Sequence, residues 1–108
     1  MVALTISVLT MTPAEFTRSL AGREPPPGLP PALVALWWAG KDEWDKAHRI
    51  VMNEESADCA WVHAYLHRRE GDRDNARYWY RRAGREQATG SLQSEWAAIV
   101  AAVLPHTS

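Results

Sequence analysis

Cysteine, net charge and long apolar runs are all scarce in this chain of 108 residues. The single cysteine, Cys59, cannot form an intrachain disulfide, and chains poor in cysteine are typical of reducing compartments, so we expect a cytoplasmic protein. No apolar run approaches the roughly 18 residues that a membrane-spanning helix needs, so we expect no membrane partner. The formal charge of −1 disfavours a dedicated nucleic-acid binder, because such domains carry a strong positive excess.

Catalytic and targeting motifs are also missing. The sequence has no nucleophile elbow, no phosphate-binding glycine loop and no paired cysteines, so none of these enzyme classes is indicated. Residues 1–11 are apolar, but they lack the basic start and the small-residue cleavage site of a signal peptide. Between Val2 and Val8, large aliphatic residues stand at every second position, which is the spacing of a β-strand. The two interpretations of this stretch are an isolated strand and a frayed tail.

A proline-rich segment separates the start of the chain from the rest. Thr12, Pro13 and Glu15 form a capping-box pattern, which predicts a short helix that ends near residue 20. Five prolines between residues 25 and 31 remove backbone donors and restrict φ, so we expect an extended linker there. The predicted organisation is a tail over residues 1–11, a short helix with the linker over 12–31, and a helical-hairpin domain over 32–108.

Helical periodicity fills the remainder of the chain. Apolar residues recur at spacings of three and four, and capping residues or glycines stand at nearly every expected boundary. Asp42 is one expected cap, at the start of the second helix of this part. We therefore predict an all-α chain with helices over residues 31–39, 43–52, 57–70, 73–83 and 92–104.

Two segments in the middle of the chain are similar to each other. Residues 36–47 and 65–76 each contain a helix end, a turn with glycine or aspartate, and a second helix with an early alanine. The matching alanines are Ala47 and Ala76, whose small side chains allow helices joined by a tight turn to approach closely. The pattern predicts two antiparallel helical hairpins, with the first and last helices covering the ends.

Residues 65–84 resemble the tetratricopeptide-repeat superfamily, including its Sel1-like members. The residues that carry the resemblance are Gly71, Asp72, Ala76, Tyr80 and Ala83. Residues 60–72 also resemble short bacterial proteins that have no assigned activity. The two similar segments are spaced more closely than the usual repeat of about 34 residues. The resemblance implies a protein-interaction module that binds a peptide or a partner helix without catalysis, which is our leading functional prediction.

The same resemblance implies a binding groove along the first helix of the second hairpin. Its lining residues would be Trp61, Tyr65, Arg68 and Arg69. Aromatic rings beside guanidinium groups suit an acidic or C-terminal peptide, through stacking and bidentate hydrogen bonds. The alternative is that both rings pack against a neighbouring helix while the arginines are solvated. An open groove with exposed rings would distinguish the first interpretation.

Two histidines suggest a different function. His63 and His67 lie four residues apart on one predicted helix, a spacing with which two imidazoles can share a metal ion. Cys59 and Glu70 project nearby, so the four residues form a continuous stripe, and His48 could supply a further ligand. This alternative is a zinc-binding protein, with metal-assisted hydrolysis using Glu70 as base as the associated activity.

The histidine stripe also has a purely structural interpretation. In the frame of the repeat, His63 and His67 occupy positions that normally pack inside the hairpin. They would then be neutral core residues with hydrogen-bond partners, such as Tyr80 or the backbone, because unpartnered burial costs a few kcal/mol. In that case the protein would need no cofactor.

The last candidate feature is a patch of basic and aromatic residues near the end of the fourth of these predicted helices. It consists of Arg77, Arg81, Arg82, Arg85 and Tyr78. Such patches can bind phosphate backbones, but the near-zero total charge favours an ordinary solvated helix face, and we expect no nucleic-acid partner. Six tryptophans in so short a chain could leave an apolar patch, so self-association into a homo-oligomer is a third functional hypothesis.

Overall fold

The computed structural model describes residues 11–105, which form six α-helices with no strand in that range. The helices are α1 (Pro13–Ser19), α2 (Pro31–Gly40), α3 (Trp44–Val51), α4 (Ala57–Glu70), α5 (Arg73–Ala83) and α6 (Leu92–Val103). The predicted all-α class is confirmed, and each helix lies within one residue of its expected ends. The candidate strand between Val2 and Val8 lies outside the described residues.

Side-chain caps and glycines determine most helix ends. Thr12 and Glu15 form the expected capping box at the start of α1. The side chains of Ser56, Asp72 and Ser91 each accept a hydrogen bond from a backbone N–H in the first turn of the helix that follows. At the far ends of α4 and α5, Gly71 and Gly84 have φ values of 89° and 69°, a left-handed conformation that glycine adopts without steric cost.

The turn between α2 and α3 differs from the prediction. Asp42 does not cap α3, because the N-cap position falls on Glu43, which makes no side-chain capping bond. Asp42 instead has a φ of 61°, and it is the only non-glycine residue with positive φ in the described part of the chain. Its carboxylate is ion-paired with Arg69 of α4, so a contact between distant segments takes the place of the local cap.

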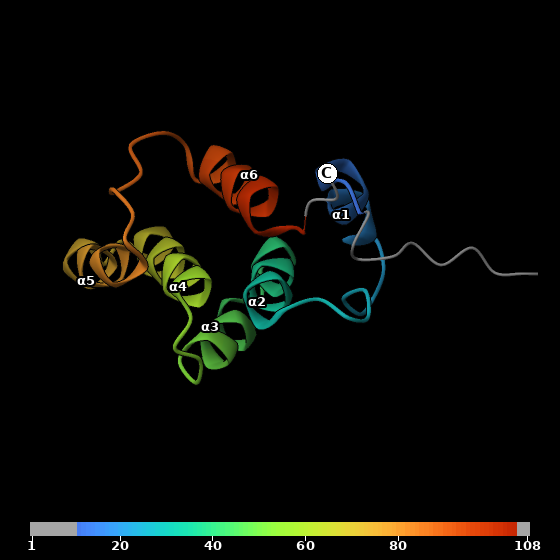
Figure 1. Ribbon diagram of the computed structural model, residues 1–108, viewed down its shortest axis with the longest axis horizontal. Helices are drawn as coiled ribbons and strands as arrows, with labels where there is room; N and C mark the ends of the chain where they lie inside the picture. The colour runs from blue at the N-terminus through green and yellow to red at the C-terminus, as the bar shows by residue number, and fades with distance from the viewer. Residues whose placement is uncertain (1–10, 106–108) are drawn as a thin grey trace, which may run out of the picture.

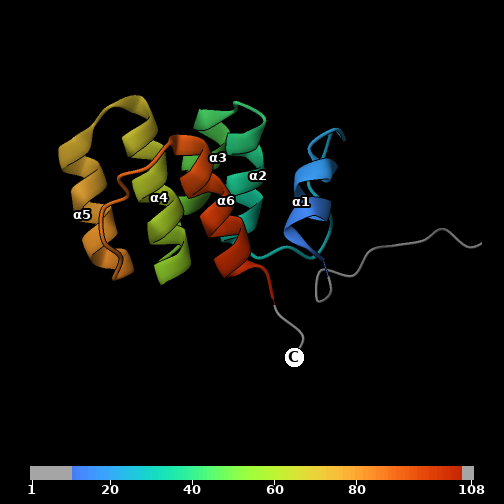
Figure 2. The same cartoon turned by 90° about the horizontal axis from the view of Figure 1, so that it is seen from above.

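The helices follow one another along an arc, with α6 on its inner side (Figure 1). The pairs α2–α3 and α4–α5 make the most extensive interhelical contacts, and each pair is joined by a short turn. The last helix, α6, packs against α4, α2 and α1, so it covers the face of α4 that is turned away from α3 and α5 (Figure 2). Ala47 and Ala76, the matching alanines, are buried, with exposed fractions of 0% and 4%.

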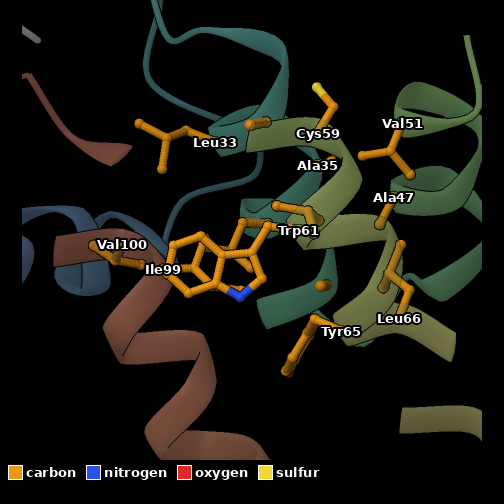
Figure 3. Close-up of a cluster of buried hydrophobic side chains, with 14 of the residues drawn as sticks. Leu33, Ala35, Ala47, Val51, Cys59, Trp61, Tyr65, Leu66, Ile99 and Val100 are labelled. Atoms are coloured by element: carbon orange, nitrogen blue, oxygen red, sulfur yellow. The ribbon is translucent and has the colours of Figure 1, made fainter. Parts of the chain in front are cut away.

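A single core runs through all six helices. Figure 3 shows the Trp61 ring reaching from α4 towards Ile99 and Val100 of α6, while Leu66 lies on the other side of α4 towards Ala47 of α3. These side chains all belong to one cluster of buried residues. Because apolar burial stabilises a fold by roughly 25 cal/mol per Å², this shared core is the main reason why α6 stays on the arc.

The short helix α1 belongs to the same core as the helices beyond the proline-rich linker. Phe16 is fully buried and its ring lies 5.7 Å from that of Trp96 in α6. The indole of Trp37 donates to the Ser19 hydroxyl, and the Lys41 ammonium donates to the Leu20 carbonyl at the end of α1. Within residues 11–105, no helix combines the length and apolar content that crossing a membrane requires.

Candidate metal centre

Three imidazoles meet between α3 and α4. His48 projects from α3, and His63 and His67 project from successive turns of α4. The Nε2 atoms of His48 and His63 are 3.1 Å apart. One ring nitrogen from each of the three histidines lies within 4.8 Å of the other two, so the three side chains could hold one ion. Of the expected stripe, the structure therefore brings His63 and His67 together, and it adds the suspected third member, His48.

Two tryptophans enclose this histidine cluster. The ring of Trp44 stacks on His48 with 4.6 Å between centroids, and that of Trp79 stacks on His63 with 3.8 Å. The Trp44 Nε1–H donates to the carbonyl of Leu66 at 2.8 Å, which anchors the indole to α4. The stacked rings restrict the orientation of the imidazoles before any ligand arrives.

Glu70 contacts His67 and orients its ring. Its Oε2 atom lies 2.5 Å from His67 Nδ1, one turn along α4. In this contact the carboxylate accepts a hydrogen bond from Nδ1–H, so Nε2 is the nitrogen with a free lone pair when the ring is neutral. Carboxylates in this position orient many metal-binding histidines.

His63 is the least satisfied member of the cluster. It is 4% exposed, and its Nδ1 atom is buried without a hydrogen-bond partner. Burial, and after it the neighbouring imidazoles of His48 and His67, lowers the pKa of His63 to about 4. Burial is also the main cause of the lowered pKa of His48, with His67 acting in the same direction. Neutral His63 therefore presents one nitrogen lone pair at pH 7.

Two other predicted participants lie elsewhere. Cys59 does not join the three-imidazole group; its side chain is buried in the hydrophobic cluster of Figure 3, and burial raises the pKa of the thiol. Tyr80 does not bond to a histidine either. Its hydroxyl donates to Glu95 of α6 at 2.5 Å. His63 and His67 are buried, as the structural interpretation expected, but their hydrogen-bond partners are His48 and Glu70 rather than Tyr80.

The four residues of the expected peptide groove do not form one open surface. Trp61 and Tyr65 are only 8% and 4% exposed, so the expected exposure of the two rings was wrong. Tyr65 and Arg69 line a hollow of about 470 Å³ with residues of α1, α2 and α6. Trp61 lines a second hollow and Arg68 a third. The physical reason is α6, which covers this face of α4.

The sequence analysis missed a second polar cluster, centred on Glu95. This residue is 5% exposed, and its carboxylate accepts hydrogen bonds from Trp61 Nε1 (3.3 Å), Tyr80 Oη (2.5 Å) and Arg68 Nη1 (3.0 Å). The bonds tie α6 to α4 and α5. One signal could have revealed it: Glu95 stands at a core position of α6, three residues after Leu92 and four before Ile99.

Comparisons of the chain with protein-family models, with curated proteins and with solved structures found no match. The resemblance to the tetratricopeptide-repeat superfamily therefore stays a prediction.

Proposed function

We propose that this chain binds a divalent transition-metal ion of the zinc class through His48, His63 and His67. The observation that carries the proposal is the convergence of one nitrogen from each ring within 4.8 Å. Two nitrogens bound to a tetrahedral zinc ion at 2.0–2.1 Å lie about 3.3 Å apart. The 3.1 Å between Nε2 of His48 and Nε2 of His63 is close to that spacing.

The energetics of the cluster also support a ligand. A buried nitrogen without a partner, such as Nδ1 of His63, costs about 1–3 kcal/mol. Leucine or phenylalanine would fill a helix interface without that cost, and three histidines are not needed to pack two helices. A metal ion at the Nε2 atoms would leave Nδ1 of His63 unpartnered, but its bonds to three neutral imidazoles, the form that binds metal, would outweigh that cost.

In this proposal Glu70 is a positioning residue rather than the general base considered above. Its carboxylate is engaged by His67 Nδ1, which leaves Nε2 of His67 for the ion. Three protein ligands would leave a fourth position for water or for a ligand from outside, as in zinc sites that act on a substrate. His48 is only half-buried, so it is the side of the cluster that solvent can reach.

Titration of metal-free protein with Zn²⁺, in competition with a chromophoric chelator, tests the proposal. We expect one ion per chain, a change in tryptophan fluorescence because Trp44 and Trp79 stack on two of the ligands, and loss of binding in His48→Gln. His48 is the ligand of choice for substitution because it is the least buried of the three. Glu70→Ala should weaken binding by about 10- to 100-fold, as expected when a second-layer carboxylate is removed.

Two matched variants control this experiment. His106→Gln removes a histidine outside the described residues and should leave the stoichiometry and affinity unchanged, whereas an equal loss in both histidine variants would mean adventitious binding. Cys59→Ala should retain the site, because Cys59 lies apart from the three imidazoles. Loss of zinc in Cys59→Ala, or no zinc binding by the unaltered chain, would overturn the three-imidazole site.

A further inference from the structure

The outer side of α5 is free of other helices. Among the described helices, α5 packs closely only against α4, apart from the hydrogen bond of Tyr80 to Glu95 of α6, and it stands at one end of the row of helices (Figures 1 and 2). Its buried side is formed by Ala76 and Tyr80. Tyr78, on another side, is 49% exposed, one of the few large apolar side chains of the described region that solvent reaches to that extent.

Positive charge is concentrated on this free side. Residues 73–85 contain five arginines and one aspartate, although the whole chain has a formal charge of −1. All five arginines are exposed. Arg77 is 3.6 Å from Asp74, and in residues 11–105 no ion pair involves Arg81, Arg82 or Arg85. The guanidinium groups of Arg81 and Arg85 therefore have unused hydrogen-bond donors, whereas Arg82 donates to the Tyr78 hydroxyl and lines a hollow with Glu54 and Glu55.

Three of the arginines surround one hollow. Arg77 and Arg81 are one turn apart on α5, and Arg85 follows the end of the helix. Together with Tyr80, Glu86 and Gln87 they line an open surface hollow of about 360 Å³. The Arg85 guanidinium stacks on the buried Trp61 ring at 3.8 Å, so this arginine is held in place by the core.

We infer that the arginine face of α5, formed by Arg77, Arg81 and Arg85, docks an acidic protein segment. The planar guanidinium group binds carboxylates through paired hydrogen bonds, and the hollow admits one or two such side chains. Tyr78 and Arg82 lie outside this face, because they line a separate hollow together with Glu54 and Glu55. The arginine face is separate from the three-imidazole cluster and does not require the metal.

A protein segment fits this face better than a nucleic acid does. The affinity of a protein for a nucleic acid increases with the number of phosphates that the protein neutralises. The acidic residues that bring the total charge to −1 lie outside residues 73–85, so a strand extending past α5 would meet repulsion. A short acidic segment would contact mainly the three arginines, with Glu86 the one acidic residue that lines the hollow, and the attraction is local and screened by salt beyond about 10 Å.

Fluorescence anisotropy with a labelled glutamate-rich peptide tests the inference. We expect saturable binding at low salt that weakens as salt is added. Arg77→Glu combined with Arg81→Glu should weaken binding roughly tenfold or more, because two attractive contacts become repulsive. Both residues are exposed, so the double variant should keep its helical circular dichroism spectrum.

The matched control reverses the same number of charges elsewhere. Arg18 of α1 and Arg49 of α3 are also exposed, and the combination of Arg18→Glu with Arg49→Glu should bind the peptide within about twofold of the unaltered chain. Equal weakening in both double variants would mean a general charge effect and would overturn the docking face. So would the absence of peptide binding, or tighter binding of an oligonucleotide of equal charge. Zinc titration of each variant should be unchanged, which separates this surface from the metal site.

Discussion

The two buried polar clusters on either side of α4 are built in opposite ways. On the side of α6, the Glu95 carboxylate receives hydrogen bonds from Trp61, Tyr80 and Arg68, so its charge is well compensated. On the side of α3 and α5, three imidazoles face one another, and Nδ1 of His63 has no partner. The first cluster is complete within the protein, and the second is not.

This difference separates a structural role from a functional one. Buried polar networks that are fully hydrogen-bonded hold a fold in one arrangement, and removing one member leaves the others unpaired. An incompletely bonded cluster contributes less stability and retains capacity for a ligand. We therefore expect substitutions in the Glu95 cluster to affect folding and those in the histidine cluster to affect binding.

The largest expected effect is that of Glu95→Ala. It would leave the indole N–H of Trp61, the Tyr80 hydroxyl and Arg68 without their acceptor beneath α6, and should lower the free energy of unfolding by about 3–5 kcal/mol. Urea denaturation measures the change. Glu54→Ala, at an exposed position, should stay within about 0.5 kcal/mol of the unaltered chain. Similar values for the two variants would refute a structural role for Glu95.

The second prediction concerns acid sensitivity of the metal-free protein. The folded chain keeps His63 neutral down to a pKa of about 4, whereas the unfolded chain protonates this residue near its ordinary value of 6.5. The unfolded state thus binds more protons in this interval, and His63 should cost the fold up to about 3 kcal/mol as the pH falls from 6.5 to 4. Urea denaturation at several pH values, compared with His63→Leu, isolates this contribution. Parallel pH profiles for the two proteins would contradict the prediction.

A third prediction follows from linkage between metal binding and folding. Zinc at 100 times its dissociation constant should raise the free energy of unfolding by about 2.7 kcal/mol, provided that it binds only the folded chain. Thermal denaturation with and without zinc measures this shift. The shift should vanish in His48→Gln and persist in Glu95→Gln, whose amide oxygen still accepts hydrogen bonds. Persistence of the full shift in His48→Gln would argue for a different site.

The smallest effect is expected for His63→Leu at pH 7. Leucine removes the unpartnered nitrogen but also the stacking on Trp79, so the free energy of unfolding should change by no more than about 1 kcal/mol. Measured by urea denaturation, this value should lie far below that of Glu95→Ala. A loss as large as that of Glu95→Ala would show that the histidine cluster also supports the fold.

Much of the helical architecture was predictable because its causes are local. The capping box of Thr12 and Glu15 and the left-handed Gly71 and Gly84 act within a few residues of the helix ends that they define. The proximity of His63 and His67 was predictable for the same reason, since residues four apart share a helix face. Asp42 was misassigned, because its ion pair with Arg69 joins segments that are distant in sequence.

The sequence by itself determined the all-α class, the helix boundaries and the histidine pair, since each depends on periodicity and on hydrogen bonds within one or two turns. Only the tertiary structure decided that α6 covers Trp61 and Tyr65, that His48 completes the imidazole cluster, and that Glu95 lies among three donors. The physical reason is that these contacts depend on how whole helices pack against one another, and helix periodicity alone does not specify which faces meet.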